Sequence, residues 1–166
     1  GKTAVIAGLA HCASEIRSVI VLTTREAIRD QLTRELSGNL FIDAEKFGLS
    51  DRIALSKSVY LLSKGSDARK SAIEAHASTK RLLQPQICAF AEKQFARLTK
   101  GKRGSLLEEM SEGRAILIMT VQMLNRLMSF HPKLYKSIAK AASHDVLDEA
   151  HYEPAEQWSK AERGLG

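Results

Sequence analysis

Two adjacent acidic residues, Asp148 and Glu149, follow an apolar pair, Val146 and Leu147, near the end of the chain. A short buried strand that ends in carboxylates delivers them to the edge of a sheet. At such an edge one carboxylate can hold Mg2+ on nucleotide phosphates, while its neighbour orients or deprotonates the attacking water. Asp-Glu pairs are also common on solvated helices, so these residues alone leave a catalytic and a surface interpretation open.

The first residues of the chain suggest a related chemistry. Gly1-Lys2-Thr3 precedes the apolar run Ala4–Ala10, as in the second half of the phosphate-binding loop G-x-x-x-x-G-K-[ST]. In such a loop, backbone N–H groups at the start of a helix hold phosphate oxygens. Lys2 would then reach the β- and γ-phosphates of ATP, and Thr3 would bind the metal ion. A phosphate loop and a strand ending in Asp-Glu need each other chemically, so each strengthens the interpretation of the other.

Together the two motifs resemble the helicases and translocases of superfamily two, in the branch whose motif is Asp-Glu-Ala-His, here residues 148–151. The resemblance covers most of the chain, with a poor match in the middle. It implies that Asp148 holds Mg2+ together with Thr3, and that Glu149 is the catalytic residue that activates water. It also implies that His151 couples the nucleotide site to a nucleic-acid site.

Length and composition narrow the possible classes of protein. The 166 residues suffice for one domain with a sizeable core. No apolar run approaches the roughly 20 residues that span a bilayer, so no membrane partner is expected. Cys12 and Cys88 have no Cys-x-x-Cys partner, which makes a disulfide or zinc site unexpected and a reducing cytoplasm the default location. The net charge of +6 is compatible with nucleic-acid binding but does not establish it.

A complete phosphate loop has a strand and a further glycine before the position of Gly1. We therefore expect the sequence to be an internal part of a longer protein, with a second RecA-like domain in the same parent chain. The alternative is that Gly1-Lys2-Thr3 is a coincidence at a natural N-terminus.

The run Ser18–Thr24 has the β-branched, apolar composition of a strand buried on both faces of a parallel sheet. The residues after it, from Thr24 and Arg25 through Gln31, are similar to the second motif of superfamily two, which touches the sugar-phosphate backbone of a single strand. A hydroxyl and N–H groups at a strand-to-helix turn suit this task because they can donate to phosphate oxygens. If Thr24 were an ordinary helix N-cap, it would explain the same residues without a ligand.

A second strand of this kind is expected at Arg114–Thr120, followed by a helix at Val121–Leu127. The turn between them is similar to the family's Thr-bearing motif, which makes Thr120 and Gln122 candidate nucleic-acid contacts. The sequence Thr-Val-Gln-Met-Leu is closer to the DNA-acting branch, which includes restriction-enzyme motor subunits, so DNA is favoured over RNA as the partner. Without a ligand, the apolar residues of this helix are simply core.

The remaining patterns predict further elements, and one of them departs from the family. His144 and Asp145 stand where relatives have apolar residues, so the strand before Asp148 is expected to be weak. The helix at the start of the chain is apolar nearly all round, which predicts that other elements cover it. The further expected elements are helices at Lys2–Cys12, Arg25–Leu36 and after Pro132, short strands at Leu40–Ile42 and Ser58–Leu62, and a helical hairpin at Ser66–Leu83 and Gln86–Leu98.

The expected architecture is α/β: a RecA-like P-loop NTPase, a three-layer sandwich with a mostly parallel sheet and helices on both faces. Residues 1–166 would be part of a helicase ATP-binding domain, truncated at both ends and carrying a helical insertion at about 64–104. By resemblance, the function is ATP-driven movement along, or separation of, nucleic acid, with ATP and Mg2+. One alternative is a P-loop ATPase that does not act on nucleic acid. The other is a basic helical module that binds nucleic acid or protein, in which Asp-Glu-Ala-His is incidental.

Overall fold

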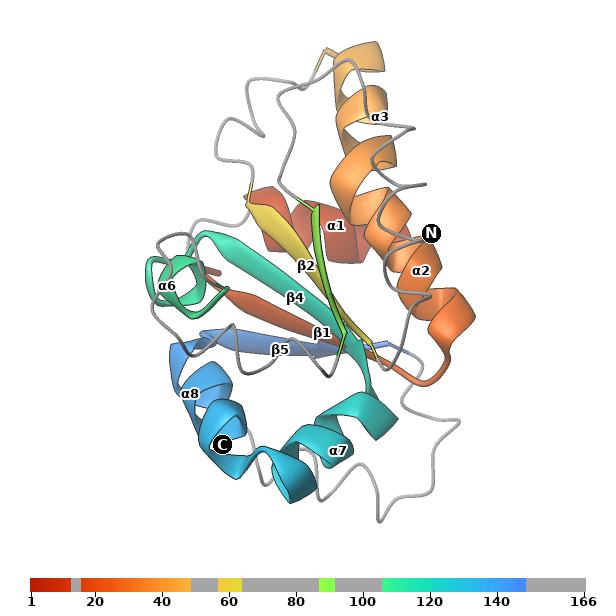
Figure 1. Cartoon of the computed structure of the whole chain (residues 1–166). Coiled ribbons are helices and arrows are strands. Elements are labelled where there is room, and N and C mark those ends of the chain that lie inside the picture. The colour runs from red at the N-terminus through yellow and green to blue at the C-terminus, as the bar shows by residue number, and fades with distance from the viewer. Residues whose placement is uncertain (13–15, 49–56, 64–86, 92–105, 149–166) are drawn as a thin grey trace.

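The computed structural model describes residues 1–12, 16–48, 57–63, 87–91 and 106–148 of the chain. These residues form helices and strands that alternate along much of the sequence (Figure 1). In chain order the elements are α1 (Lys2–Cys12), β1 (Val19–Thr23), α2 (Glu26–Arg34), the π-helical segment η1 (Glu35–Asn39), α3 (Leu40–Lys46), β2 (Ser58–Ser63), β3 (Ile87–Ala91), α6 (Leu106–Ser111), β4 (Ala115–Thr120), α7 (Val121–Phe130), α8 (Pro132–Ala141) and β5 (His144–Leu147).

Five strands form one sheet in the order β3-β2-β4-β1-β5, and every pairing is parallel. β4 and β1 are neighbours near its middle, and all residues of both strands are buried. Strands covered on both faces are continuous apolar runs, as the sequences VIVLT and AILIMT are. The register pairs Thr23 with Thr120, so the two strands end at the same level of the sheet.

Helices cover both faces of the sheet and give three layers (Figure 1). Because side chains alternate along a strand, Ile20 and Leu22 of β1 pack in a cluster with α6, α7 and α8. Val19 and Val21 point the other way and pack with α1, α2 and η1. The α/β class and the parallel sheet expected from the sequence are therefore confirmed.

Two buried polar side chains fix the C-terminal end of α1. Nε2 of His11 donates to the carbonyl of Leu36 (2.8 Å), and its Nδ1 accepts the backbone N–H of Lys57 (3.4 Å). The ammonium of Lys57 donates to the carbonyls of Ala10 (2.7 Å) and Ile16. The last carbonyls of a helix lack partners within it, so a lysine placed there satisfies them. The pKa of His11 is lowered to about 4, mainly by burial and to a smaller extent by the charge of Lys57, while the hydrogen bond to Leu36 acts in the opposite direction.

Most of the elements expected from the sequence are present, but two were assigned wrongly. Leu40–Ile42 was expected as a strand and is the first turn of α3, which continues the helical run of α2 and η1. Gln86–Leu98 was expected as a helix, yet Ile87–Ala91 is strand β3, paired with β2. A short apolar run fits a buried strand and a buried helix equally well, because periodicity does not separate them. The other residues of the expected insertion, 64–86 and 92–104, lie outside the described residues.

The expectation that α1 is covered on all sides is also wrong for the part of the chain that the structure describes. Ala7 and Ala10 face the sheet and are buried, but Val5 is 68% exposed and Leu9 is 41% exposed. A helix that lies on one face of a sheet buries only one stripe. The apolar residues on its opposite side are therefore left in contact with solvent.

No helix among the described residues is long and apolar enough to cross a membrane.

Candidate functional site

The helices that follow β1 and β4 leave the sheet toward opposite faces, although the two strands are neighbours. α2 follows β1 and packs on the face of α1, whereas α7 follows β4 and packs on the face of α8. Where neighbouring parallel strands send their chains to opposite sides, a crevice opens at their carboxyl ends, and α/β proteins bind ligands there. The turns β1–α2 and β4–α7 therefore lie side by side at the position that this fold class uses for ligands.

The β1–α2 turn carries a buried hydroxyl, that of Thr24, which makes no hydrogen bond within the described structure. Thr23 Oγ1 donates to the carbonyl of Arg25 (3.2 Å) and tightens the turn. Thr24 is buried, and its Oγ1 has no hydrogen-bond partner. The N-cap of α2 is Arg25, and no side chain caps this helix. The alternative interpretation of Thr24 as an N-cap is therefore wrong.

The β4–α7 turn is organised by Thr120, which caps its helix. Thr120 Oγ1 accepts the backbone N–H of Met123 (3.2 Å), the usual bond of a threonine N-cap. Gln122 follows it, and its Nε2 donates to the carbonyl of Thr24 (3.3 Å). This bond joins the two turns across 98 positions of sequence. The hydroxyl of Thr120 thus has a structural role as a helix cap, whereas the hydroxyl of Thr24 makes no hydrogen bond in the described structure.

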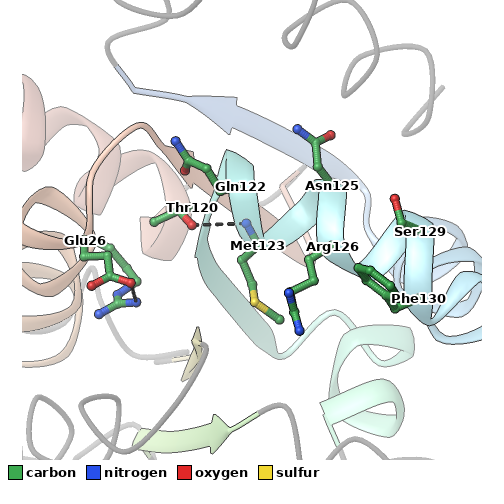
Figure 2. Close-up of a pocket in the computed structure, with 9 residues that line it drawn as sticks. Glu26, Thr120, Gln122, Met123, Asn125, Arg126, Ser129 and Phe130 are labelled. Atoms are coloured by element: carbon green, nitrogen blue, oxygen red, sulfur yellow. Dashed lines mark hydrogen bonds and ion pairs between the residues drawn. The ribbon is translucent and has the colours of Figure 1, made fainter.

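A cavity of about 390 Å³ opens beside these turns, between α2 and α7. Its size lies within the range of small-molecule sites, about 300–1,000 Å³. Figure 2 shows Glu26 on one side of it and the side chains of α7 on the other. The lining residues are Glu26, Arg29, Thr120, Gln122, Met123, Asn125, Arg126, Ser129 and Phe130.

The cavity includes some of the residues expected to contact nucleic acid and leaves others out. Thr120 and Gln122 line it, and Thr24 is joined to Gln122. Arg25 and Gln31 are exposed on the turn and on α2, and neither lines the cavity.

Sequence reasoning missed several residues of the cavity, among them Arg29. Its buried guanidinium is 2.8 Å from Asp30 and 3.7 Å from Glu26. Buried charges need such partners, because burying an isolated charge is costly. A charged residue at a helix position otherwise expected to face the core was the signal that could have identified it.

Arg126 and Phe130 were missed as well, and they form a pair at the far end of the cavity. The guanidinium of Arg126 lies 5.0 Å from the centre of the Phe130 ring, close enough for a cation–π contact. Phe130 is 65% exposed at the end of α7. Their i, i+4 spacing was the available signal, since such residues meet on one face of a helix.

Of the residues expected to bind the nucleotide, Asp148 lies at the same edge of the sheet as the two turns, whereas Lys2 and Thr3 begin α1, which packs on one face. Lys2 and Thr3 form the first turn of α1, and Lys2 is exposed. Asp148 directly follows β5, is 9% exposed, and its backbone N–H donates to the carbonyl of Leu22 (2.9 Å). Asp148 therefore stands at the carboxyl edge, one strand away from the β1–α2 turn. Glu149 and His151 lie outside the described residues.

The oxygen donors of Asp148 and Thr3 are of the type that Mg2+ prefers over transition metals. Asp148 offers a carboxylate and Thr3 a hydroxyl, and Mg2+ is commonly held by one or two protein oxygens together with phosphates and water. Among the described residues, no group of three His, Cys, Asp or Glu side chains could hold a metal ion. Two protein oxygens are fewer than a metal ion needs, so a magnesium ion held by them would depend on phosphate and water oxygens for the rest of its ligands.

The strand before Asp148 is as weak as the sequence predicts. His144 and Asp145 are exposed, and Val146 and Leu147 are only partly buried. β5 is held by its pairing with β1, which extends over four residues.

Comparison with known proteins found no match: no family model, no curated protein and no solved structure matches the chain.

Proposed function

We propose that this chain is part of an ATP-hydrolysing, RecA-like motor domain that acts on nucleic acid, of the kind found in superfamily two helicases and translocases. The proposal rests on the chemistry of the two end motifs and on where the fold puts the residues between them. DNA is the favoured nucleic acid, because the sequence after Thr120 is closer to the DNA-acting branch.

The observation that carries the proposal is the alignment of three strand ends. β4, β1 and β5 are consecutive in the sheet, and their carboxyl ends are followed by Val121, Thr24 and Asp148. One edge of the sheet therefore presents two hydroxyl-bearing turns and then a carboxylate. A motor that couples hydrolysis to strand movement needs a phosphate-facing acid next to a backbone-facing surface, and this edge has the residue types for both.

Each residue of the nucleotide end has a separate task in this proposal. Lys2 binds the β- and γ-phosphates of ATP by charge, and the N–H groups at the start of α1 donate to phosphate oxygens. Thr3 and Asp148 would hold Mg2+, which neutralises charge on the phosphates when bound. Glu149 accepts a proton from the attacking water, a task worth about 10²–10⁴ in rate.

The alternative of a P-loop ATPase without nucleic acid shares the nucleotide residues but gives no task to Thr24. Its buried Oγ1 has no partner in the described structure, and leaving a buried hydroxyl unsatisfied costs about 1–3 kcal/mol. A phosphate oxygen that accepts from this hydroxyl would offset the cost, and because the Oγ1 atom is buried, the turn would have to move to admit it. The other alternative, a helical module, does not agree with a five-stranded parallel sheet.

The test is ATP hydrolysis by the full-length protein that carries this chain, measured with and without single-stranded DNA. We expect single-stranded DNA to raise the turnover, and we expect Lys2→Ala to abolish it by weakening ATP binding. Ser58→Ala is a matched control, because Ser58 lies at the opposite, amino end of a strand. Hydrolysis that DNA does not change would favour the ATPase without nucleic acid. Absence of ATP binding would remove the proposal altogether.

A further inference from the structure

We infer that the cavity between α2 and α7 accepts a single nucleobase, which stacks on Phe130 while the phosphates of its strand pass over the two neighbouring turns. The inference deepens the proposed function and rests on it, because it requires a nucleic-acid strand at the carboxyl edge. It names a base-binding site, most of whose residues, among them Asn125, Ser129 and Phe130, lie beyond the two threonine turns.

The aromatic ring of Phe130 is the first element of the argument. A single exposed apolar side chain is ordinary on a protein surface and needs no explanation by itself. Phe130, however, borders a cavity, and the Arg126 guanidinium lies over its ring. An aromatic ring beside an arginine forms the kind of platform on which proteins stack unpaired bases.

The polar groups of α7 are the second element. Gln122, Asn125 and Ser129 follow one another at helical spacing, and all three line the cavity. Amides present a donor and an acceptor side by side, which matches the donor and acceptor groups on the edge of a base. A ligand that uses both a ring face and such groups is planar and has polar edges, as nucleobases do.

The position of the cavity is the third element. It adjoins Thr120, and the Gln122 side chain on its wall is hydrogen-bonded to the β1–α2 turn. A strand whose phosphates lie along both turns would carry its bases within reach of α7. The base of a free mononucleotide would make the same contacts as a base in a strand, so the experiment has to distinguish these two ligands.

The experiment measures binding of a fluorescein-labelled oligothymidylate by the full-length protein, in the wild type and as Phe130→Ala. Stacking of one base is typically worth a five- to hundredfold change in affinity, which is the loss expected for Phe130→Ala. Phe130→Tyr should retain wild-type affinity because the ring remains. The slope of affinity against salt should not change, since no charge is removed.

Phe47→Ala is the matched control. Phe47 is 69% exposed and has Lys46 at 5.8 Å from the centre of its ring, so it is also an exposed ring next to a cation. It follows α3 and does not line the cavity. We expect this variant to bind the strand as the wild type does.

A strand of the same length made of abasic nucleotides completes the test. The wild type should bind it more weakly than oligothymidylate, and this difference should be much smaller in Phe130→Ala, which keeps only the polar contacts to the base. Equal binding of both strands by the wild type, or wild-type affinity in Phe130→Ala, would overturn the inference and leave the proposed function intact. Displacement of the strand by thymidine monophosphate at equal nucleotide concentration would assign the cavity to free nucleotides and also overturn it. A protein that binds no single strand would overturn the proposed function and the inference together.

Discussion

The threonine turns and the nucleotide motifs belong to elements that are buried to different extents. The threonine turns follow β1 and β4, whose residues are all buried, and a hydrogen bond from Gln122 joins them. The nucleotide motifs belong to α1 and β5, which are only partly buried. Among the described residues, no strand pairs with the outer side of β5.

Because of this difference, replacements in the two regions should have different effects on stability and on ligand binding. A side chain in the middle of the sheet has neighbours on every side, so replacing it should disturb the fold before it disturbs a ligand. An exposed side chain of α1 or β5 has few neighbours, so its replacement should change ligand binding more than it changes stability. Four predictions test this contrast. The first three concern stability, from the largest expected effect to the smallest, and the last concerns catalysis.

Replacing a leucine in each region should give very different costs. Leu22 of β1 is fully buried, and Leu22→Ala should lower the free energy of unfolding by about 2–5 kcal/mol, through lost burial and a cavity. Leu9 of α1 is 41% exposed, so Leu9→Ala should cost about 1 kcal/mol or less. Urea denaturation of both variants measures the two costs. Equal costs would mean that α1 is held as firmly as the central strands.

The bonds of His11 make the attachment of α1 depend on pH. The pKa of His11 is lowered from 6.5 to about 4 in the folded protein, so the unfolded chain binds this proton more readily. Stability from this group is complete above pH 6.5 and falls as the pH drops toward 4, by on the order of 3 kcal/mol in all. Urea denaturation between pH 7 and pH 4 measures it.

His11→Gln is the control for this pH dependence. Glutamine can still donate to the carbonyl of Leu36 but does not titrate, so the part of the pH dependence that comes from His11 should disappear. A wild-type curve that matches His11→Gln at every pH would contradict the neutral, buried histidine.

The two threonines of the crevice should respond in opposite ways to the same change. Thr120→Val removes the cap of α7 and should cost about 0.5–2 kcal/mol. Thr24→Val removes a buried hydroxyl without a partner, so the free energy of unfolding should stay the same or rise by up to about 1 kcal/mol. Thermal or urea unfolding of the two variants measures the difference.

Thr24→Val also reports on the ligand, because it should leave the fold intact. If its hydroxyl donates to a phosphate, the variant should bind single-stranded DNA about tenfold more weakly. Unchanged affinity in a protein that otherwise binds single strands would remove Thr24 from the nucleic-acid surface.

The central strands and the helices of amphipathic pattern could be predicted from the sequence. Ser18–Thr24 and Arg114–Thr120 are apolar runs rich in β-branched residues, which favours strands, and the structure has β1 and β4 there. Leu40–Ile42 was misassigned because three apolar residues fit either element, and the helix that precedes them decides the outcome. Whether the helical run of α2 and η1 continues through Leu40–Ile42 depends on the tertiary structure. The local sequence pattern does not show it.

The candidate site was predictable in part. Thr120 and Gln122 were proposed from their resemblance to a family motif, and Asp148 because it follows an apolar pair. The parallel strands bring these residues to one edge of the sheet, and their roles stay predictions. The cavity was not predictable, because Glu26 and Arg126 are 100 positions apart and line the same cavity only as a result of the strand order. Strand order depends on long-range pairing, which residue types do not specify.

The most direct measurement is ATP affinity and turnover of Glu149→Gln beside Lys2→Ala in the full-length protein. Glutamine is nearly isosteric with glutamate, so ATP binding should survive while turnover falls about 10²–10⁴-fold, because the group that takes the proton of water is lost. Lys2→Ala should instead bind ATP poorly, because a charge paired with phosphate is removed. One variant would hold ATP without hydrolysing it, and the other would hardly hold it. Turnover by Glu149→Gln at the wild-type rate would contradict the proposed function at its centre.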